Sequence, residues 1–175
     1  MKRFYLVVFF SFLVAFVFSS TSFGDDDYKN SLDCFISKLD NKCKNALKLT
    51  RDDYVEENQP DGTNLDRSES GYQWLECQDK LLDIVFKNVL ISHNEFLDFS
   101  KDLPSLYKEG KIFIKNIDKS YKEWKSFRNN FCENTAAIDF LGGSGVWASI
   151  QSCKELVSWQ YTYTLITTSM NLECK

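Results

Sequence analysis

The chain has 175 residues, a formal net charge of −4 and an aromatic content of 15%. This acidic balance disfavours nucleic acid and anionic membrane as partners and favours a cationic partner. Only two prolines and seven glycines interrupt the chain, which suits helices joined by few breaks. The composition therefore indicates a helical protein of one domain, large enough to bury a core.

The first 24 residues have the organisation of a signal peptide. Lys2 and Arg3 precede an apolar run from Phe4 to Phe18, and Ser22-Phe23-Gly24 then gives the small-x-small pattern that signal peptidase accepts. The apolar run approaches the ~17 residues that span a bilayer, so an uncleaved anchor is the alternative. We predict cleavage, which leaves residues 25–175 with a net charge of −6. The mature protein is then periplasmic or secreted and does not insert into a membrane.

The first part of the mature chain predicts one helix and a loop. Apolar residues at helical spacing run from about Tyr28 to Leu49, although Asp40-Asn41 could divide this helix in two. Residues 50–70 are polar and acidic and contain the turn sequence Pro60-Asp61-Gly62, which predicts a loop. Residues 25–70 are thus expected to form an N-terminal helix and an acidic loop.

Residues 71–175 form the predicted helical domain. Its helices run from about Gln73 to Phe99, from Ser105 to about Phe140 and from about Val146 to Asn171. The glycines of segment 142–145 end the second of them, since glycine readily adopts the left-handed conformation of a helix terminus. Together with the N-terminal helix, this predicts an all-α, antiparallel bundle of about four helices held by disulfides.

The helix ending near Phe140 has the clearest pattern. Its predicted seam alternates steps of three and four, which is typical of antiparallel helix packing, and consists of Ile114, Ile117, Tyr121, Trp124, Arg128, Phe131, Thr135 and Ile138. A row of lysines marks the face that we expect to be solvated: Lys108, Lys111, Lys115, Lys119, Lys122 and Lys125.

Six cysteines follow the signal peptide, and an even count in an exported domain predicts three disulfides. They are Cys34, Cys43, Cys77, Cys132, Cys153 and Cys174. Metal binding is the competing interpretation, but the chain has no C-x-x-C pair and only one histidine, whereas zinc sites use closely spaced Cys and His ligands. We therefore predict no metal and no cofactor.

The spacing of Trp124, Arg128 and Cys132 places all three on one helix face. A glycine-rich turn and an apolar segment with Cys153 follow, which predicts a helical hairpin with a Cys132–Cys153 disulfide across its turn. Four cysteines then allow three pairings. Two of these pairings stay open: Cys43–Cys77 with Cys34–Cys174, and Cys34–Cys43 with Cys77–Cys174.

The motif Trp124-x3-Arg128-x3-Cys132, followed by Gly142-Gly143-Ser144 and Cys153, resembles the core motif of the LprI-like lysozyme inhibitor family. That family consists of small exported bacterial proteins with a helical fold. Leu82-Asp83-x-x-Phe86 is similar to a Leu-Asn-x-x-Tyr pattern of the same family. The chain departs from the family after Cys153, where Ser158 and Tyr161 replace a common Thr-x-x-Arg. The resemblance implies a non-catalytic protein whose protein partner is lysozyme, a cationic muramidase.

We expect the motif residues to serve mainly as a scaffold. Trp124 would bury its ring between helices. Arg128 would bond the carbonyls of the Gly142–Ser144 turn or pair with Asp139. A direct contact with a partner is the alternative, and its candidate surface is the Gly142–Gly145 turn with the acidic segment Glu56–Glu69.

An enzyme is the other class considered. Gly142-Gly143-Ser144-Gly145-Val146 nearly matches the G-x-S-x-G nucleophile elbow, but Val146 replaces the last glycine and a helix precedes it where the elbow needs a strand. His93 has polar neighbours, so we expect it on a solvated helix face. The prediction is an exported, non-catalytic binding protein that inhibits lysozyme. The alternative is a structural or interaction module of the exported compartment with no lysozyme contact.

Overall fold

The structure is a computed structural model that describes residues 25–140, 145–169, 172 and 174. Within these residues the chain forms helices and no strands, which confirms the predicted all-α fold. The predicted signal peptide, residues 1–24, lies outside the described residues. No described helix combines the length and the apolar character that crossing a membrane requires.

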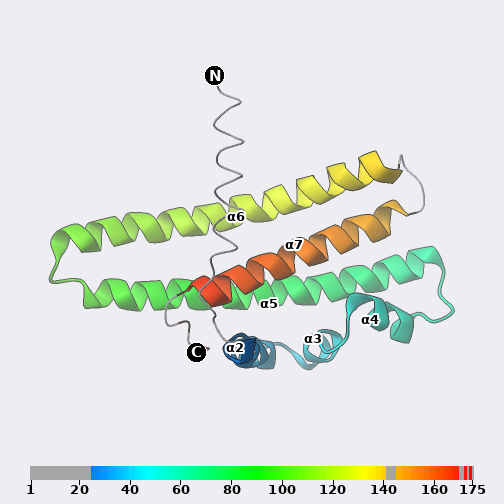
Figure 1. Ribbon diagram of the computed structural model, residues 1–175, viewed down its shortest axis with the longest axis horizontal. Coiled ribbons are helices and arrows are strands. Elements are labelled where there is room, and N and C mark those ends of the chain that lie inside the picture. The colour runs from blue at the N-terminus through cyan, green and yellow to red at the C-terminus, as the bar shows by residue number, and fades with distance from the viewer. Residues whose placement is uncertain (1–24, 141–144, 170–171, 173, 175) are drawn as a thin grey trace, which may run out of the picture.

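Three long helices form the body of the protein: α5 (Asn64–Phe99), α6 (Pro104–Phe140) and α7 (Val146–Thr168). They lie side by side, with α6 antiparallel to the other two and α7 in contact with both (Figure 1). Three short helices, α2 (Asp25–Ser37), α3 (Asn41–Ala46) and α4 (Arg51–Asn58), pack along α5, and α2 also reaches α7. The described chain therefore has six helices where about four were predicted.

The N-terminal region is more helical than its polar composition predicts. The loop predicted at residues 50–70 is wrong, because α4 and the start of α5 occupy most of it. Thr50 caps α4 by accepting a hydrogen bond from the Asp53 N–H, and Thr63 and Asp66 form a reciprocal capping box at the start of α5. Two Thr-x-x-Asp sequences thus start helices inside an acidic segment. The domain boundary expected after residue 70 falls within α5.

Asp40 divides the first predicted helix into α2 and α3. Its carboxylate accepts a hydrogen bond of 2.9 Å from the Cys43 N–H and so caps α3. This bond lowers the pKa of the Asp40 carboxyl, because it stabilises the charged form. The cap turns the chain before Cys43, whose side chain is buried against α5.

The larger core lies where the short helices meet α5 and α7. Trp74 is its largest fully buried side chain, and its indole N–H donates to the carbonyl oxygens of Ala46 (3.0 Å) and Leu49 (3.3 Å). Phe35 from α2 and Leu81 from α5 are buried in the same cluster. Replacing a buried tryptophan by alanine costs about 3–5 kcal/mol, so Trp74 is a main anchor for the N-terminal helices.

The predicted seam of α6 holds at Tyr121 and Arg128 but fails toward the end of the helix. Phe131 and Ile138 are 46% and 75% exposed, whereas Cys132 and Ala136 are buried. A straight helix drifts about 20° per heptad from a strict 3.5-residue repeat. Over the length of α6 this drift moves the buried face by one position.

Three disulfides brace the bundle and join Cys34 to Cys174, Cys43 to Cys77, and Cys132 to Cys153. Of the two pairings left open by the sequence, the structure contains the first. Cys43–Cys77 ties α3 to α5, Cys34–Cys174 ties the C-terminal end to α2, and Cys132–Cys153 ties α6 to α7.

Candidate functional site

Arg128 is the centre of a buried polar cluster that joins all three long helices. Its guanidinium forms a two-pronged ion pair with the carboxylate of Asp79 on α5, and one of its nitrogens also donates to the Ser158 hydroxyl on α7 at 2.7 Å. Arg128 is 5% exposed and Ser158 is fully buried. A planar guanidinium suits this arrangement because its five N–H donors can serve several partners at once.

The partners of Arg128 differ from those predicted. Asp79 and Ser158 were not foreseen, and Asn129 accepts two further hydrogen bonds from the same guanidinium. The predicted partners, the carbonyls of the Gly142–Ser144 turn and the Asp139 side chain, lie outside what the structure describes. The spacing between Asp79 and Ser158 in sequence carries no signal, because only the packing of α5 against α7 brings them together.

Trp124 lies one turn before Arg128 in a stack of four nearly parallel aromatic rings. Its ring centroid is 4.0 Å from that of Tyr161 on α7, and the Arg128 guanidinium lies 5.6 Å from its centroid. Tyr121 continues the stack and lies 3.8 Å from Phe86 on α5. The ring of Trp124 is half-buried between helices.

A second polar group lies beside this stack. The Tyr121 hydroxyl donates to the Asp83 carboxylate at 2.6 Å, and the Lys125 ammonium donates to the same oxygen at 2.7 Å. Burial raises the pKa of Tyr121 strongly, and the hydrogen bond to Asp83 raises it further. Asp83 and Phe86 belong to the segment that extends the family resemblance, so the two segments of the resemblance touch in the structure.

These motif residues face one another across the helix interfaces and brace the bundle. Trp124, Arg128 and the Cys132–Cys153 disulfide each connect α6 to α7. Gly142, Gly143 and Ser144 lie outside the described residues, so their role stays a prediction.

Of the surface elements predicted to contact a partner, Gly142–Ser144 lie outside the described residues, and the acidic segment lies at the opposite end of the bundle from the α5–α6 connection (Figure 1). The start of α7, the end of α6, the start of α5 and α4 all lie toward this end (Figure 1). Trp147, two residues after Gly145, is 56% exposed, and its ring packs edge-on against Tyr72 of α5 with centroids 6.3 Å apart. The sequence analysis did not single out this aromatic pair.

One acidic residue lies close to that aromatic pair, and an acidic segment lies at the same end of the bundle. Burial raises the pKa of the Tyr72 hydroxyl, and the negative charge of Glu133 on α6 raises it further, which places this carboxylate close to the pair. Residues 51–69 add seven carboxylates against two arginines, a net charge of −5. The carboxylates are Asp52, Asp53, Glu56, Glu57, Asp61, Asp66 and Glu69. We call this surface the acidic end: residues 51–69, Tyr72, Glu133 and Trp147.

His93 is half-buried, and its neighbours Asn94 and Glu95 are exposed. Its Nδ1 lies 2.8 Å from the Val89 carbonyl oxygen, and since a carbonyl only accepts, Nδ1 carries the proton. The ring packs against Phe113 with centroids 5.8 Å apart.

Among the described residues, no three His, Cys, Asp or Glu side chains form a group able to hold a metal ion. Comparison with protein-family models, with curated proteins and with solved structures found no match to this chain. The resemblance to LprI-like inhibitors thus rests on the motif residues alone.

Proposed function

We propose that this protein is an exported, non-catalytic binding protein whose acidic end engages a cationic protein, with a lysozyme-type muramidase as the target. One observation carries the proposal. The acidic segment 51–69 and the start of α7 at Val146 are about eighty positions apart in sequence, yet both lie at one end of the bundle, where the exposed Trp147 of α7 contacts Tyr72 of α5.

The electrostatics of the acidic end favour a cationic partner. A net charge of −5 within nineteen residues attracts a positive surface over about 8–10 Å at physiological salt. Such complementarity raises the association rate more than it lengthens the lifetime of the complex. The lysine row of α6 lies on another face and disfavours docking of a cationic partner there.

The Trp147–Tyr72 pair supplies apolar contact area, which the charged residues do not provide. Tryptophan and tyrosine are enriched among residues that dominate binding energy, because they bury a large rigid surface at a small entropic cost. Tyr72 supports the Trp147 ring edge-on, so the exposed indole is partly ordered before binding. Trp147 is in the first turn of α7 and Tyr72 in the third turn of α5, and these helices are braced by the Arg128 cluster and the Cys132–Cys153 disulfide.

Lysozyme is the proposed target because of the motif. In support, the motif residues Trp124, Arg128 and Cys132 form one contiguous brace, and Phe86 of the second resembling segment stacks on Tyr121 within it. Because the motif residues hold the helices together, we assign the contact with lysozyme to the acidic end and not to the motif.

The test is inhibition of a c-type lysozyme on cell-wall substrate by purified, oxidised residues 25–175 at two salt concentrations. We expect stoichiometric inhibition that weakens at the higher salt. Trp147→Ala should weaken inhibition by roughly 30-fold, the effect of a hot-spot residue. Leu156→Ala is the matched control, since Leu156 is a large apolar residue 70% exposed on the same helix.

Charge reversal provides a second, independent readout. Glu56→Lys with Glu57→Lys should slow association and flatten its salt dependence. Asp118→Lys with Glu123→Lys on α6 makes the same change in net charge away from the acidic end and should have little effect. Equal effects of both double variants, or no inhibition at micromolar excess, would contradict the proposal.

A further inference from the structure

The α5–α6 hairpin extends past the end of α7. Thr168, the last residue of α7, lines the same cavity as Val89 of α5, whereas α5 continues ten residues further to Phe99 and α6 begins only at Pro104. Ten residues of helix correspond to about 15 Å. Over that length the bundle has two long helices where the rest has three.

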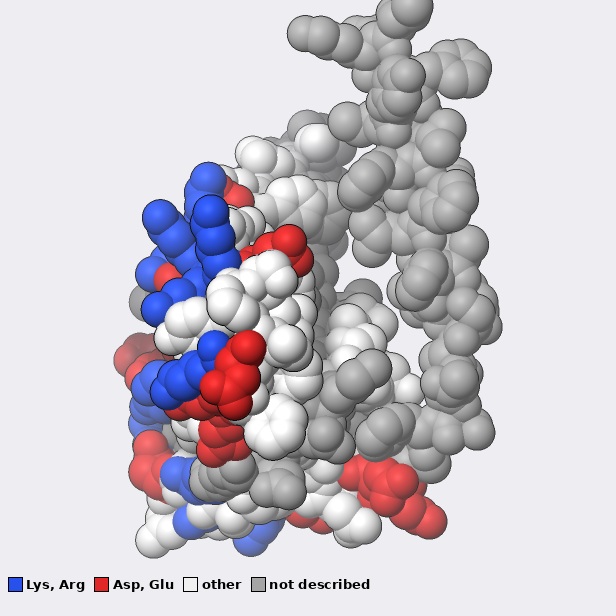
Figure 2. Space-filling view, turned by 90° about the vertical axis from the view of Figure 1, so that its left-hand side faces the viewer, with Lys and Arg blue, Asp and Glu red and all other residues white. Residues whose placement is uncertain are grey.

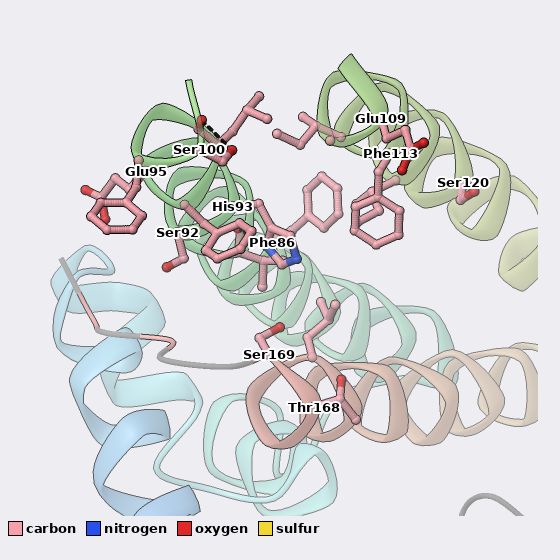
Figure 3. Close-up of a pocket in the computed structure, with 18 of the residues that line it drawn as sticks. Phe86, Ser92, His93, Glu95, Ser100, Glu109, Phe113, Ser120, Thr168 and Ser169 are labelled. Carbon is pink, nitrogen blue, oxygen red and sulfur yellow. Dashed lines mark hydrogen bonds between the residues drawn. The ribbon is translucent and has the colours of Figure 1, made fainter. Parts of the chain in front are cut away.

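A groove lies between the two hairpin arms and the end of α7. Its volume is about 1090 Å³, and its walls carry Phe86, Phe96, Phe99, Leu106, Phe113 and Leu165 (Figure 3). The C-terminal residues lead away from it, because Cys174 is bonded to Cys34 and Leu172 packs against the main core. The described end of the chain thus leaves the groove open.

Exposed apolar side chains concentrate at the hairpin end, and four of them line this groove: Phe96, Phe99, Leu106 and Phe113. Seven of the fifteen large hydrophobic residues exposed in the described chain lie between positions 91 and 113: Ile91, Phe96, Phe99, Leu103, Leu106, Ile112 and Phe113. Phe96, Phe99 and Phe113 are 64%, 89% and 54% exposed. At ~200 Å² per side chain these three alone expose roughly 400 Å². A patch of this size marks an interaction surface.

The two arms of the hairpin carry opposite charge. The α5 arm, residues 91–102, has Glu95, Asp98 and Asp102 against Lys101, a net charge of −2. The α6 arm, residues 104–119, has Lys108, Lys111, Lys115 and Lys119 against Glu109 and Asp118, a net charge of +2. Figure 2 looks at this end of the bundle and shows basic side chains gathered on one side of an uncharged surface.

We propose that a second copy of this chain covers the groove, and that the two hairpin ends pack into a four-helix bundle related by a two-fold axis. In that arrangement the acidic α5 arm of each copy lies beside the basic α6 arm of the other, so both charge contacts are favourable. Two-fold interfaces bring the same patch of both copies together. A hairpin with one acidic and one basic arm is complementary to a second copy of itself. Binding of a lipid or an unrelated helix would not require opposite charges on the two arms.

The apolar surface is of the size such an interface needs. A standard interface buries about 800 Å² on each partner. The exposed parts of the three phenylalanines, roughly 400 Å² together, supply about half of that area, and the exposed part of Leu106 in the same groove adds to it. The acidic end lies at the opposite end of the bundle, so dimerisation leaves it accessible, and the inference is independent of the proposed function.

The first measurement is the mass of oxidised residues 25–175 by light scattering and sedimentation velocity from 1 to 200 µM. We expect a dimer at the higher concentrations. Phe99→Glu should raise the dimer dissociation constant by at least about 30-fold, with helix content unchanged because Phe99 is 89% exposed. Leu65→Glu, at a residue 77% exposed at the other end of α5, is the control and should remain dimeric.

A charge-exchange experiment tests the arrangement of the arms. Variant one carries Lys108→Glu, Lys111→Glu and Lys115→Glu; variant two carries Glu95→Lys and Asp98→Lys. Each variant alone should be mainly monomeric at low salt, and an equimolar mixture should form a heterodimer, seen when one tagged variant captures the other. A monomeric wild type at 200 µM, a dimeric Phe99→Glu variant, or a mixture that stays monomeric would overturn the proposal. A monomer that carries a co-purified lipid by native mass spectrometry would assign the groove to that lipid instead.

Discussion

Removal of the Arg128 charge is the sharpest test of how this bundle is held together. Arg128 is 5% exposed, and its partner Asp79 has a side chain that is 34% exposed. Loss of one member of a buried ion pair costs about 3–5 kcal/mol, since the other charge is left uncompensated. Asp79 can regain part of its hydration, so we expect Arg128→Met to cost about 3 kcal/mol, at the lower end of that range.

Substitution of the partner, Asp79, should reduce the free energy of unfolding by a larger amount. Asp79→Leu leaves a guanidinium that is almost fully buried, and we expect a loss of about 4–5 kcal/mol. The double variant Arg128→Met with Asp79→Leu removes both charges, so its loss should be about 1–2 kcal/mol, mainly from the unpaired Ser158 hydroxyl. The two single losses are thus expected to be strongly non-additive.

The assay is urea unfolding followed by circular dichroism under oxidising conditions, with thermal unfolding as a check. A loss of about 3 kcal/mol corresponds to a melting temperature lower by about 9 °C for a chain of this size. Lys122→Met is the control, since Lys122 is exposed and its ion pair, with Asp118 at 2.7 Å, lies within a single helix. The argument is refuted if Arg128→Met costs less than about 1 kcal/mol or if the double variant costs the sum of the single ones.

Three further predictions follow from the same structure. Replacement of both Cys132 and Cys153 by serine opens a loop of 21 positions and should lower the free energy of unfolding by about 3 kcal/mol. Equal urea midpoints for the variant and the wild type would contradict a stabilising role of this disulfide. Gly71→Ala should destabilise the fold by about 1 kcal/mol or more although alanine favours helices, because the new methyl would lie 2.2 Å from the Gln151 side-chain oxygen; a more stable variant would show that α7 can shift. The pKa of Tyr121 is raised in the folded state. The contribution of Tyr121 to stability is therefore present below about pH 10, the pKa of tyrosine in an unfolded chain, and is lost as the pH rises above that value. Tyr121→Phe should flatten this alkaline loss in urea midpoints measured from pH 8 to 11, and an unchanged slope would contradict the assignment.

The long helices and their approximate ends follow from the sequence, because apolar spacing, Pro104 and the glycines after Phe140 are local signals. The same local logic would have found α4 and the start of α5 from Thr50-x-x-Asp53 and Thr63-x-x-Asp66, but the acidic composition of the segment favoured a loop. The capping sequences thus predict these helices correctly, and the acidic composition was the misleading signal.

Other features depend on how whole helices are placed against one another. Arg128 was expected to meet groups near in sequence, yet it pairs with Asp79 on α5 and Ser158 on α7. The burial of Cys132 in place of Phe131 depends on the drift of a long helix relative to its neighbours. The groove results from the different lengths of α7 and the hairpin, which no local pattern encodes. The Trp147–Tyr72 pair was missed for the same reason.

The Cys34–Cys174 bond has a mechanical consequence. It joins positions 140 apart, near both ends of the segment 25–175. A force applied to residues 25 and 175 therefore passes through the sulfur–sulfur bond and bypasses the helices between them. In an oxidised molecule only the short end segments would extend, whereas reduction would release roughly 450–500 Å of chain at ~3.3–3.6 Å per residue. A protease or unfoldase that pulls from either end would thus meet a closed ring that it must thread as two strands.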